Sequence, residues 1–152
     1  MADRLRILYL GLLHAWNERD AEAMAACFTD GGIMIGFDGS LAEGGPAIRD
    51  HLAPIFRDHP TAAFLTVLRA RRATSRGGIL LADVAMVPPG GDQLIPATLA
   101  RQTLVAEECD GDIRVALFQN TPTDLDWDDE GRKALLGELG RAFKDRGLLP
   151  EA

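Results

Sequence analysis

The stretch that decides the fold runs from residue 15 to residue 30 and reads AWNERDAEAMAACFTD. The polar run from Asn17 to Asp20 interrupts an apolar helical pattern, and Asp20 is a typical helix N-cap, since its carboxylate accepts from free backbone amides. The residues that follow predict a short second helix from Ala21 to Phe28, with Met24 facing inward. Asp30-Gly31-Gly32 then predicts a turn.

Helical and strand patterns extend from this stretch in both directions. On its N-terminal side, apolar residues at helical spacing predict a largely buried first helix from Asp3 to Trp16. On its C-terminal side, Ile33 to Phe37 predicts a strand and Asp38-Gly39 a tight turn. A third helix opens at Pro46, because proline costs little in a first helical turn, and ends near His59.

Beyond the third helix the pattern changes from helix to strand. Apolar, β-branched runs separated by Gly- and Pro-containing turns predict four strands, at residues 63–74, 78–87, 95–107 and 112–120. A final amphipathic helix is predicted from Lys133 to Arg146. The order predicts an α+β fold: a cone-shaped, curved antiparallel or mixed sheet wrapped on three N-terminal helices, plus a C-terminal helix. Such a cone leaves one end open as a pocket for a small ligand.

The composition fits one globular domain and argues against several partners. The chain has 152 residues, of which 47% are hydrophobic, enough for a sizeable core. Sixteen Lys and Arg against 23 Asp and Glu give a net charge of -7, so no nucleic-acid partner is expected. The two cysteines, Cys27 and Cys109, lack metal-ligand spacing and indicate a reducing cytoplasm.

The N-terminal apolar run resembles a secretory signal only superficially. Arg4 and Arg6 precede the apolar residues Ile7 to Leu13, but the polar run at 17–20 lies where a signal peptide stays apolar or small. No window approaches the ~20 apolar residues that a membrane span requires. We therefore expect an unprocessed cytoplasmic protein with no membrane partner.

Several short motifs carry a resemblance to a known superfamily. Trp16-Asn17-Glu18-Arg19-Asp20, followed by Cys27-Phe28-Thr29-Asp30, looks like the opening of the nuclear transport factor 2-like superfamily, whose fold is a cone-shaped α+β structure. The likeness continues at Gly45 to His51 and at Thr103 to Val105. It closes at Phe118-Gln119-Asn120-Thr121, which resembles the ending of the SgcJ/EcaC group of SnoaL-like proteins. The resemblance implies a cone domain over residues 1–123 and leaves 124–152 as a C-terminal helical extension.

The superfamily hosts enzymes and plain binding modules on one scaffold, so the resemblance speaks to fold and not to chemistry. The catalytic base of ketosteroid isomerase aligns with Gly36, its tyrosine with Leu12, and its second acid falls near Arg101. None of these residues can do the corresponding work, which argues against that reaction. No dinucleotide, phosphate-loop, nucleophile-elbow or zinc-protease motif is present. We therefore expect no cofactor and no metal. The SgcJ/EcaC group is named an oxidoreductase group, but this sequence contains no cofactor-binding motif that would support such an activity.

Six residues are candidates for the site. His51 is the candidate catalytic residue, because histidine moves protons near neutral pH and the SgcJ/EcaC group often has histidine there. The candidate ligand-binding residues are Trp16, Asn17, Arg101, Gln119 and Asn120. Successive strand residues face opposite ways, so only one of each pair, 101 and 102 or 119 and 120, points into the cone. The sequence leaves both choices open.

Two functions remain open from the sequence. In the first, the cone binds a small hydrophobic or polyketide-like molecule and performs acid–base chemistry, as an isomerase, cyclase or hydratase does. In the second, it is a ligand carrier or dimerisation module without turnover. Gln119 stands where the SgcJ/EcaC group usually has histidine, which favours binding because glutamine transfers no proton at neutral pH. We also expect a homodimer joined through the outer face of a four-stranded sheet.

The C-terminal helix is expected to dock rather than to remain a free tail. One helical face carries Leu135 or Leu136 together with Leu139 and Phe143, and such a stripe must be buried, either across its own cone or on the partner subunit. Trp127 is the expected anchor of this segment because its ring has the largest area to bury.

Overall fold

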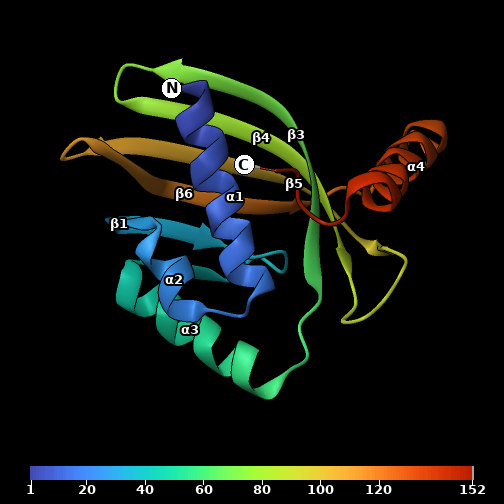
Figure 1. The fold of residues 1–152 in the computed structure, drawn as a ribbon, viewed down its shortest axis with the longest axis horizontal. Coiled ribbons are helices and arrows are strands. Elements are labelled where there is room, and N and C mark those ends of the chain that lie inside the picture. Colours follow the sequence, from blue (N-terminus) through green and yellow to red (C-terminus); the bar gives the residue numbers. More distant parts are fainter. Residues whose placement is uncertain (152) are drawn as a thin grey trace.

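The computed structural model describes residues 1–151, and its elements are drawn in Figure 1. The helices are α1 (Ala2–Asn17), α2 (Ala21–Ala26), α3 (Gly45–Asp58) and α4 (Asp129–Arg146). The strands are β1 (Phe28–Ile35), β2 (Leu41–Glu43), β3 (Ala63–Thr74), β4 (Gly77–Val87), β5 (Ile95–Cys109) and β6 (Asp112–Pro122). The prediction of an α+β fold with three N-terminal helices, one mixed sheet and a C-terminal helix is confirmed.

All six strands form one sheet in the order β2-β1-β6-β5-β4-β3. Neighbouring strands run antiparallel, except for β1 and β6, which run parallel. The sheet is therefore wider than the four strands expected from the second half of the sequence. The short strand β2 has no counterpart among the predicted elements.

The predicted turn at Asp30–Gly32 is wrong, because these residues lie inside β1. A Cβ on Gly32 would lie 2.7 Å from the Val115 carbonyl oxygen of β6, so this close approach requires glycine. The register between β1 and β6 also shifts between Phe28 and Ile33. The second helix accordingly ends at Ala26, because Phe28 already belongs to the strand.

The three N-terminal helices cover one face of the sheet, called here the inner face. Figure 1 shows α1 lying across this face, with α2 and α3 beside it toward β1 and β2. Side chains with no exposed area, including Leu5 and Leu12 of α1, Leu80 of β4 and Leu104 of β5, meet in the main core. Burial of each such leucine stabilises the fold by roughly 1.5–3 kcal/mol, which explains why α1 is apolar on most of its circumference.

Helix α4 lies against the opposite, outer face of the sheet. Its Leu135 and Leu139 are buried in a second apolar cluster with Leu65 of β3, Val87 of β4 and Leu99 of β5. The helix begins at a clear cap, where the Asp128 carboxylate accepts from the Gly131 amide at 2.8 Å. The apolar stripe thus contacts the sheet of its own chain.

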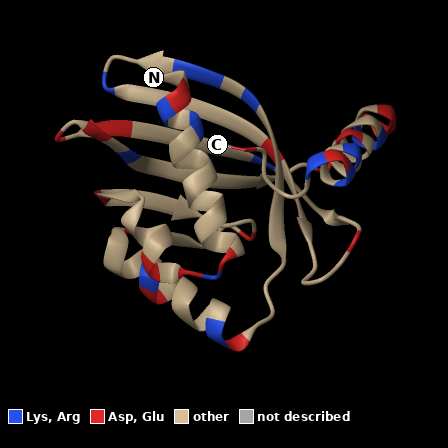
Figure 2. Ribbon diagram, viewed as in Figure 1, with Lys and Arg blue, Asp and Glu red and all other residues tan. Residues whose placement is uncertain are grey.

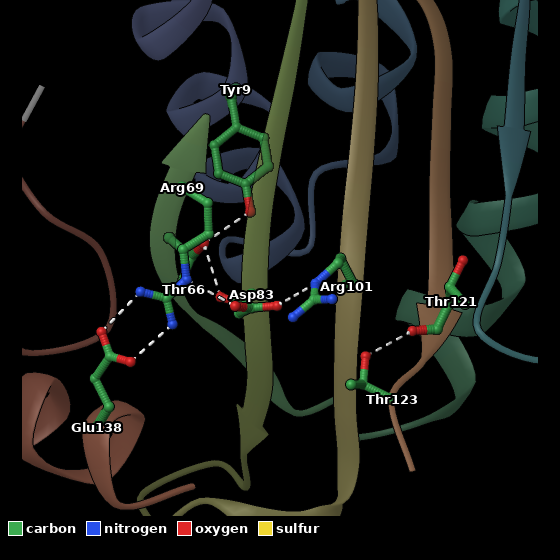
Figure 3. Close-up of polar contacts among 8 residues, drawn as sticks. All are labelled: Tyr9, Thr66, Arg69, Asp83, Arg101, Thr121, Thr123 and Glu138. Atoms are coloured by element: carbon green, nitrogen blue, oxygen red, sulfur yellow. Dashed lines mark hydrogen bonds and ion pairs between the residues drawn. The ribbon is translucent and has the colours of Figure 1, made fainter. Parts of the chain in front are cut away.

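An ion network joins α4 to the same outer face (Figure 3). The carboxylate of Asp83, only 1% exposed, accepts from Arg69 Nε at 2.7 Å and from Arg101 Nε at 2.8 Å. Arg69 also makes two hydrogen bonds of 2.8 Å to Glu138 of α4, and these hold the pKa of that carboxyl below its usual range. The β3–β4 register shifts between Leu68 and Ala70, so Arg69 is the extra residue of a bulge.

Trp127 is not the anchor of the C-terminal segment. Its side chain is fully exposed, because it lies in the 123–128 connection before α4 begins. The contacts are made instead by Leu135, Leu139 and Glu138. The prediction weighed ring size alone. In the structure the connection meets the sheet through the Thr123 amide, which donates to the Leu99 carbonyl oxygen, and through Leu125, which packs against the second apolar cluster.

Charged residues gather along α4, at helix ends and at strand ends (Figure 2). On α4 the two signs are interspersed, and β3 carries the exposed Arg71 and Arg72. Within residues 1–151, the helices are all too short or too polar to cross a bilayer.

Candidate functional site

A cavity of about 290 Å³ lies between the inner face of the sheet and the N-terminal helices. Its walls come from the end of α1, from α2 and α3, from β1 and the turn between β1 and β2, and from β3 to β6. Most of the lining is apolar: Trp16, Met24, Met34, Phe37, Leu52, Ile55, Phe64, Met86, Ala100 and Phe118. The polar lining side chains are Asp38, Ser40, His51, Thr98 and Asn120.

The end of α1 supplies an aromatic wall. Trp16 packs edge-on against Phe56 with ring centroids 5.0 Å apart, and its indole Nε1 donates to the Ala62 carbonyl at 2.9 Å. Asn17 does not line the cavity. Its side-chain amide instead donates to the Phe64 carbonyl at 3.1 Å and accepts from the Phe64 amide at 2.7 Å. Asn17 is therefore a clamp between α1 and β3 that holds the wall in place.

His51 and Asp38 both line the more exposed end of the cavity, where Asp38 is exposed and His51 is half-buried. His51 projects from α3, and Asp38 lies in the turn after β1. The backbone amide of Ser40 donates to the Asp38 carboxylate at 2.9 Å. This hydrogen bond, with smaller contributions that include the nearby His51, lowers the pKa of Asp38. Among residues 1–151, no protein group forms a hydrogen bond with the His51 ring, so it is available to a ligand.

The strand register settles the two choices that the sequence leaves open. Gln102 of β5 pairs with Asn120 of β6, and Asn120 lines the cavity. Arg101 therefore faces outward, where it binds Asp83. Gln119 also faces outward, because it lies between the two cavity-lining residues Phe118 and Asn120. Of the six candidates, the structure brings Trp16, His51 and Asn120 together and places the other three elsewhere.

A buried polar chain lies behind Asn120. The hydroxyl of Tyr9 is 2.8 Å from Thr66 Oγ1 and donates to Gln102 Oε1 at 2.6 Å. The Gln102 amide nitrogen donates to Asn120 Oδ1 at 2.7 Å. Figure 3 shows the Tyr9 hydroxyl pointing to Thr66. Tyr9, Thr66 and Gln102 have no exposed area, and this burial raises the pKa of Tyr9 far above its usual range.

Sequence reasoning missed Tyr9 and Asp38 as site residues, and it left Gln102 as the open alternative to Arg101. One signal was present: Tyr9 is the single tyrosine of the chain, on a helix of otherwise apolar character, and a buried tyrosine hydroxyl needs a partner. Gly36 lies in the cavity wall and Leu12 in the core, where neither supplies a proton-transferring group. In the described part of the chain, no three potential metal-binding side chains gather together. The site therefore offers one imidazole, one exposed carboxylate and one amide around an apolar space.

Comparison with known proteins connects this geometry to a fold. No family model matches the sequence, and no curated protein matches it. A domain of unknown function with a cystatin-like fold from Nostoc punctiforme superposes with a TM-score of 0.71 at 18% identity, over 92% of this chain and 94% of that one. A nuclear transport factor 2-like protein of unknown function from Shewanella oneidensis gives 0.59 at 14% identity, over 78% and 97%. The chain has a nuclear transport factor 2-like fold.

Other solved structures with this shape extend the comparison. A protein of unknown function from Mycobacterium tuberculosis superposes with a TM-score of 0.66 at 23% identity, over 95% of this chain and 94% of that one. At such identities the likeness concerns the fold. Because the nuclear transport factor 2-like fold carries many activities, the cavity residues have to indicate the chemistry.

Proposed function

We propose that this protein binds a small, largely apolar molecule in the cavity between the sheet and the N-terminal helices. The observation that carries the proposal is the cavity itself, which is about 290 Å³ in volume and has ten apolar side chains in its wall. A concave apolar space with a few convergent polar groups is the usual form of a small-molecule site. A hydrophobic or polyketide-like skeleton fits this lining.

Acid–base turnover on the bound molecule is the catalytic form of this proposal. His51 supports it, because an imidazole without a hydrogen bond to the described protein lines the same wall as the apolar side chains. The alternative is a carrier without turnover. Glutamine at position 119 does not favour the carrier, because that side chain faces away from the cavity. Membership of the SgcJ/EcaC group of SnoaL-like proteins is part of the proposal.

The experiment that tests the proposal is mass spectrometry of the purified protein for a co-purified small molecule, followed by incubation with that molecule. Release of an altered molecule supports the enzyme, and return of the same molecule supports the carrier. The control is Ala100→Leu, which adds atoms to the cavity wall and should exclude the ligand. Equal ligand content in both proteins would place the molecule outside the cavity and contradict the proposal.

Two further parts of the proposal concern the whole chain. We propose that residues 1–123 form the ligand-binding cone domain and that 124–152 are its helical extension. We also propose that two copies pair through the part of the outer sheet face that lies beyond α4. Half-buried apolar side chains such as Val105 and Leu117 support this pairing, since they lie on that face.

A further inference from the structure

In the buried polar chain behind the cavity, every hydrogen bond is donated in the same direction, toward Asn120. Tyr9 reaches Gln102 Oε1 at 2.6 Å, and an amide oxygen only accepts, so the Tyr9 hydroxyl is the donor. The Tyr9 oxygen then accepts from the Thr66 hydroxyl across 2.8 Å, which is the shorter of the two contacts of that hydroxyl, the other being with the Asp83 carbonyl oxygen at 3.4 Å. Because its oxygen is occupied, the Gln102 amide turns its nitrogen to Asn120 Oδ1, at 2.7 Å. The Asn120 side-chain nitrogen is consequently the last donor in this row of hydrogen bonds.

The opposite direction is disfavoured by Ile35. The outer atom of the Asn120 amide lies 3.5 Å from the Ile35 carbonyl oxygen. If Gln102 and Asn120 were both turned over, that atom would be an oxygen, and two acceptors would face each other without a proton between them. With nitrogen in this position the contact is a long hydrogen bond. At 3.5 Å it uses little of the donor capacity of the amide, which remains available to a ligand.

Two other polar groups of the wall already have partners. The Trp16 indole donates to Ala62, and the Thr98 hydroxyl donates to the Ile95 carbonyl at 2.6 Å while accepting from the Met86 amide at 2.7 Å. Asp38, Ser40 and His51 belong to the exposed end of the cavity. The sheet side of the cavity therefore offers the Asn120 N–H to the ligand.

We propose that Asn120 is a fixed hydrogen-bond donor and that the ligand is an apolar carbonyl compound whose oxygen accepts from it. Tyr9 and Gln102 are positioning residues, because they hold the amide in this orientation without touching the ligand. A carbonyl oxygen only accepts, so it matches the N–H that Asn120 presents on the sheet side of the cavity. This inference rests on the proposed function, since it requires a ligand in the cavity.

A pair of probes of matched shape tests the inference. Acetylnaphthalene and ethylnaphthalene, substituted at the same ring position, differ by a carbonyl oxygen in place of two hydrogens. Calorimetric titration should show the ketone binding about tenfold more tightly than the hydrocarbon, the value of one net hydrogen bond. The infrared C=O stretch of the bound ketone should move to lower frequency than in alkane solution. Asn120→Leu should remove both the affinity ratio and the shift.

A second variant tests the positioning residues. Tyr9→Phe removes the proton that orients Gln102, so the affinity ratio between ketone and hydrocarbon should fall toward one. Leu12→Val is the matched control, because it also changes a fully buried side chain of α1 but leaves the polar chain intact. The control should lose stability and keep the ratio. A role for Tyr9 in packing alone would leave the ratio of Tyr9→Phe at the wild-type value.

The wild-type protein gives a measurement that does not depend on the folding of any variant. The Asn120 side-chain amide resonances should shift on addition of acetylnaphthalene and stay in place on addition of ethylnaphthalene. Equal affinities for both probes, without a shift of these resonances, would overturn the role of Asn120 and leave the apolar cavity as a binding site. Failure of both probes to bind would overturn the proposed function, and this inference with it.

Discussion

At Tyr9 an ionisable side chain has no exposed area, and its burial raises its pKa. In the unfolded chain a tyrosine titrates near pH ~10. A pKa that is higher in the folded state gives stability that is fully present below the unfolded pKa and is lost as the pH rises above it. We expect the protein to unfold in alkali rather than to ionise Tyr9 in place.

The measurement is direct because Tyr9 is the only tyrosine of the chain. Tyrosinate absorbance, followed against pH, should rise in one cooperative step that coincides with the loss of circular dichroism. Tyr9→Phe should lose stability near neutral pH and show a weaker decline above pH ~10. A gradual titration of Tyr9 near pH ~10, with the dichroism unchanged, would contradict burial of the hydroxyl.

His51 should matter for the ligand more than for the fold. Since the described residues give its ring no hydrogen bond, His51→Ala should change the free energy of unfolding by less than about 1 kcal/mol. Binding of the co-purified ligand, or its turnover, should weaken. His59→Ala is the matched control, because His59 is exposed just after α3 and outside the cavity wall. A stable His51→Ala protein with unchanged affinity would remove His51 from the site.

At the scale of the elements, α4 depends on its contact with the sheet. Leu139 has no exposed area, so Leu139→Ala should lower the free energy of unfolding, or of local opening of α4, by ~2–5 kcal/mol. Amide hydrogen exchange over Asp129–Arg146 should accelerate accordingly. Lys133→Ala, at an exposed position of the same helix, should leave the exchange unchanged. Exchange that is already unprotected in the wild-type protein would show that α4 does not dock.

Local patterns predicted most elements, because the hydrophobic periodicity of a helix or a long strand is carried by residues that are close in sequence. Helix α3 and strands β3 and β4 lie within one or two residues of their predicted positions. What the sequence could not supply depends on distant partners. Strand β2 is three residues long and exists because Ala42 pairs with Met34 of β1. The sequence around Gly32 is typical of a turn, but the structure requires glycine there because β6 approaches the backbone closely.

The candidate site was harder to predict for the same reason. Arg101 and Gln102 are both polar, so neither marks the buried face by its own chemistry. Their orientation follows from the register, which bulges shift between Val84 and Met86 and again between Val105 and Ala106. The sequence therefore predicted Trp16, His51 and Asn120 among the wall residues. It named Arg101 and Gln119 as candidates with their orientation left open, and the structure turns both of them to the outer face.

At the scale of the whole molecule, the outer face of the sheet is only partly covered. Helix α4 covers the region around Leu65, Val87 and Leu99, and the apolar side chains beyond it stay half-buried or exposed. Ile79 of β4 is 38% exposed, while Val105 and Leu117 are half-buried partners in the β5–β6 register. A second copy presenting the same face would bury these side chains by symmetry, as a two-fold dimer does.

We therefore expect a dimer in solution, and one charge should dissociate it. Leu117→Lys places an ammonium on the outer face, where a partner would have to desolvate it. Light scattering at micromolar protein concentration should therefore show a monomer. This monomer should keep the circular dichroism spectrum and the cavity ligand of the wild-type protein. Ile7→Lys is the control: Ile7 is 59% exposed on α1, on the helix side of the sheet, and its replacement should leave the dimer intact. A wild-type protein that is already monomeric at this concentration would contradict the pairing. A dimer that survives Leu117→Lys would require a different interface, and the apolar outer face would then be a solvated surface beside α4.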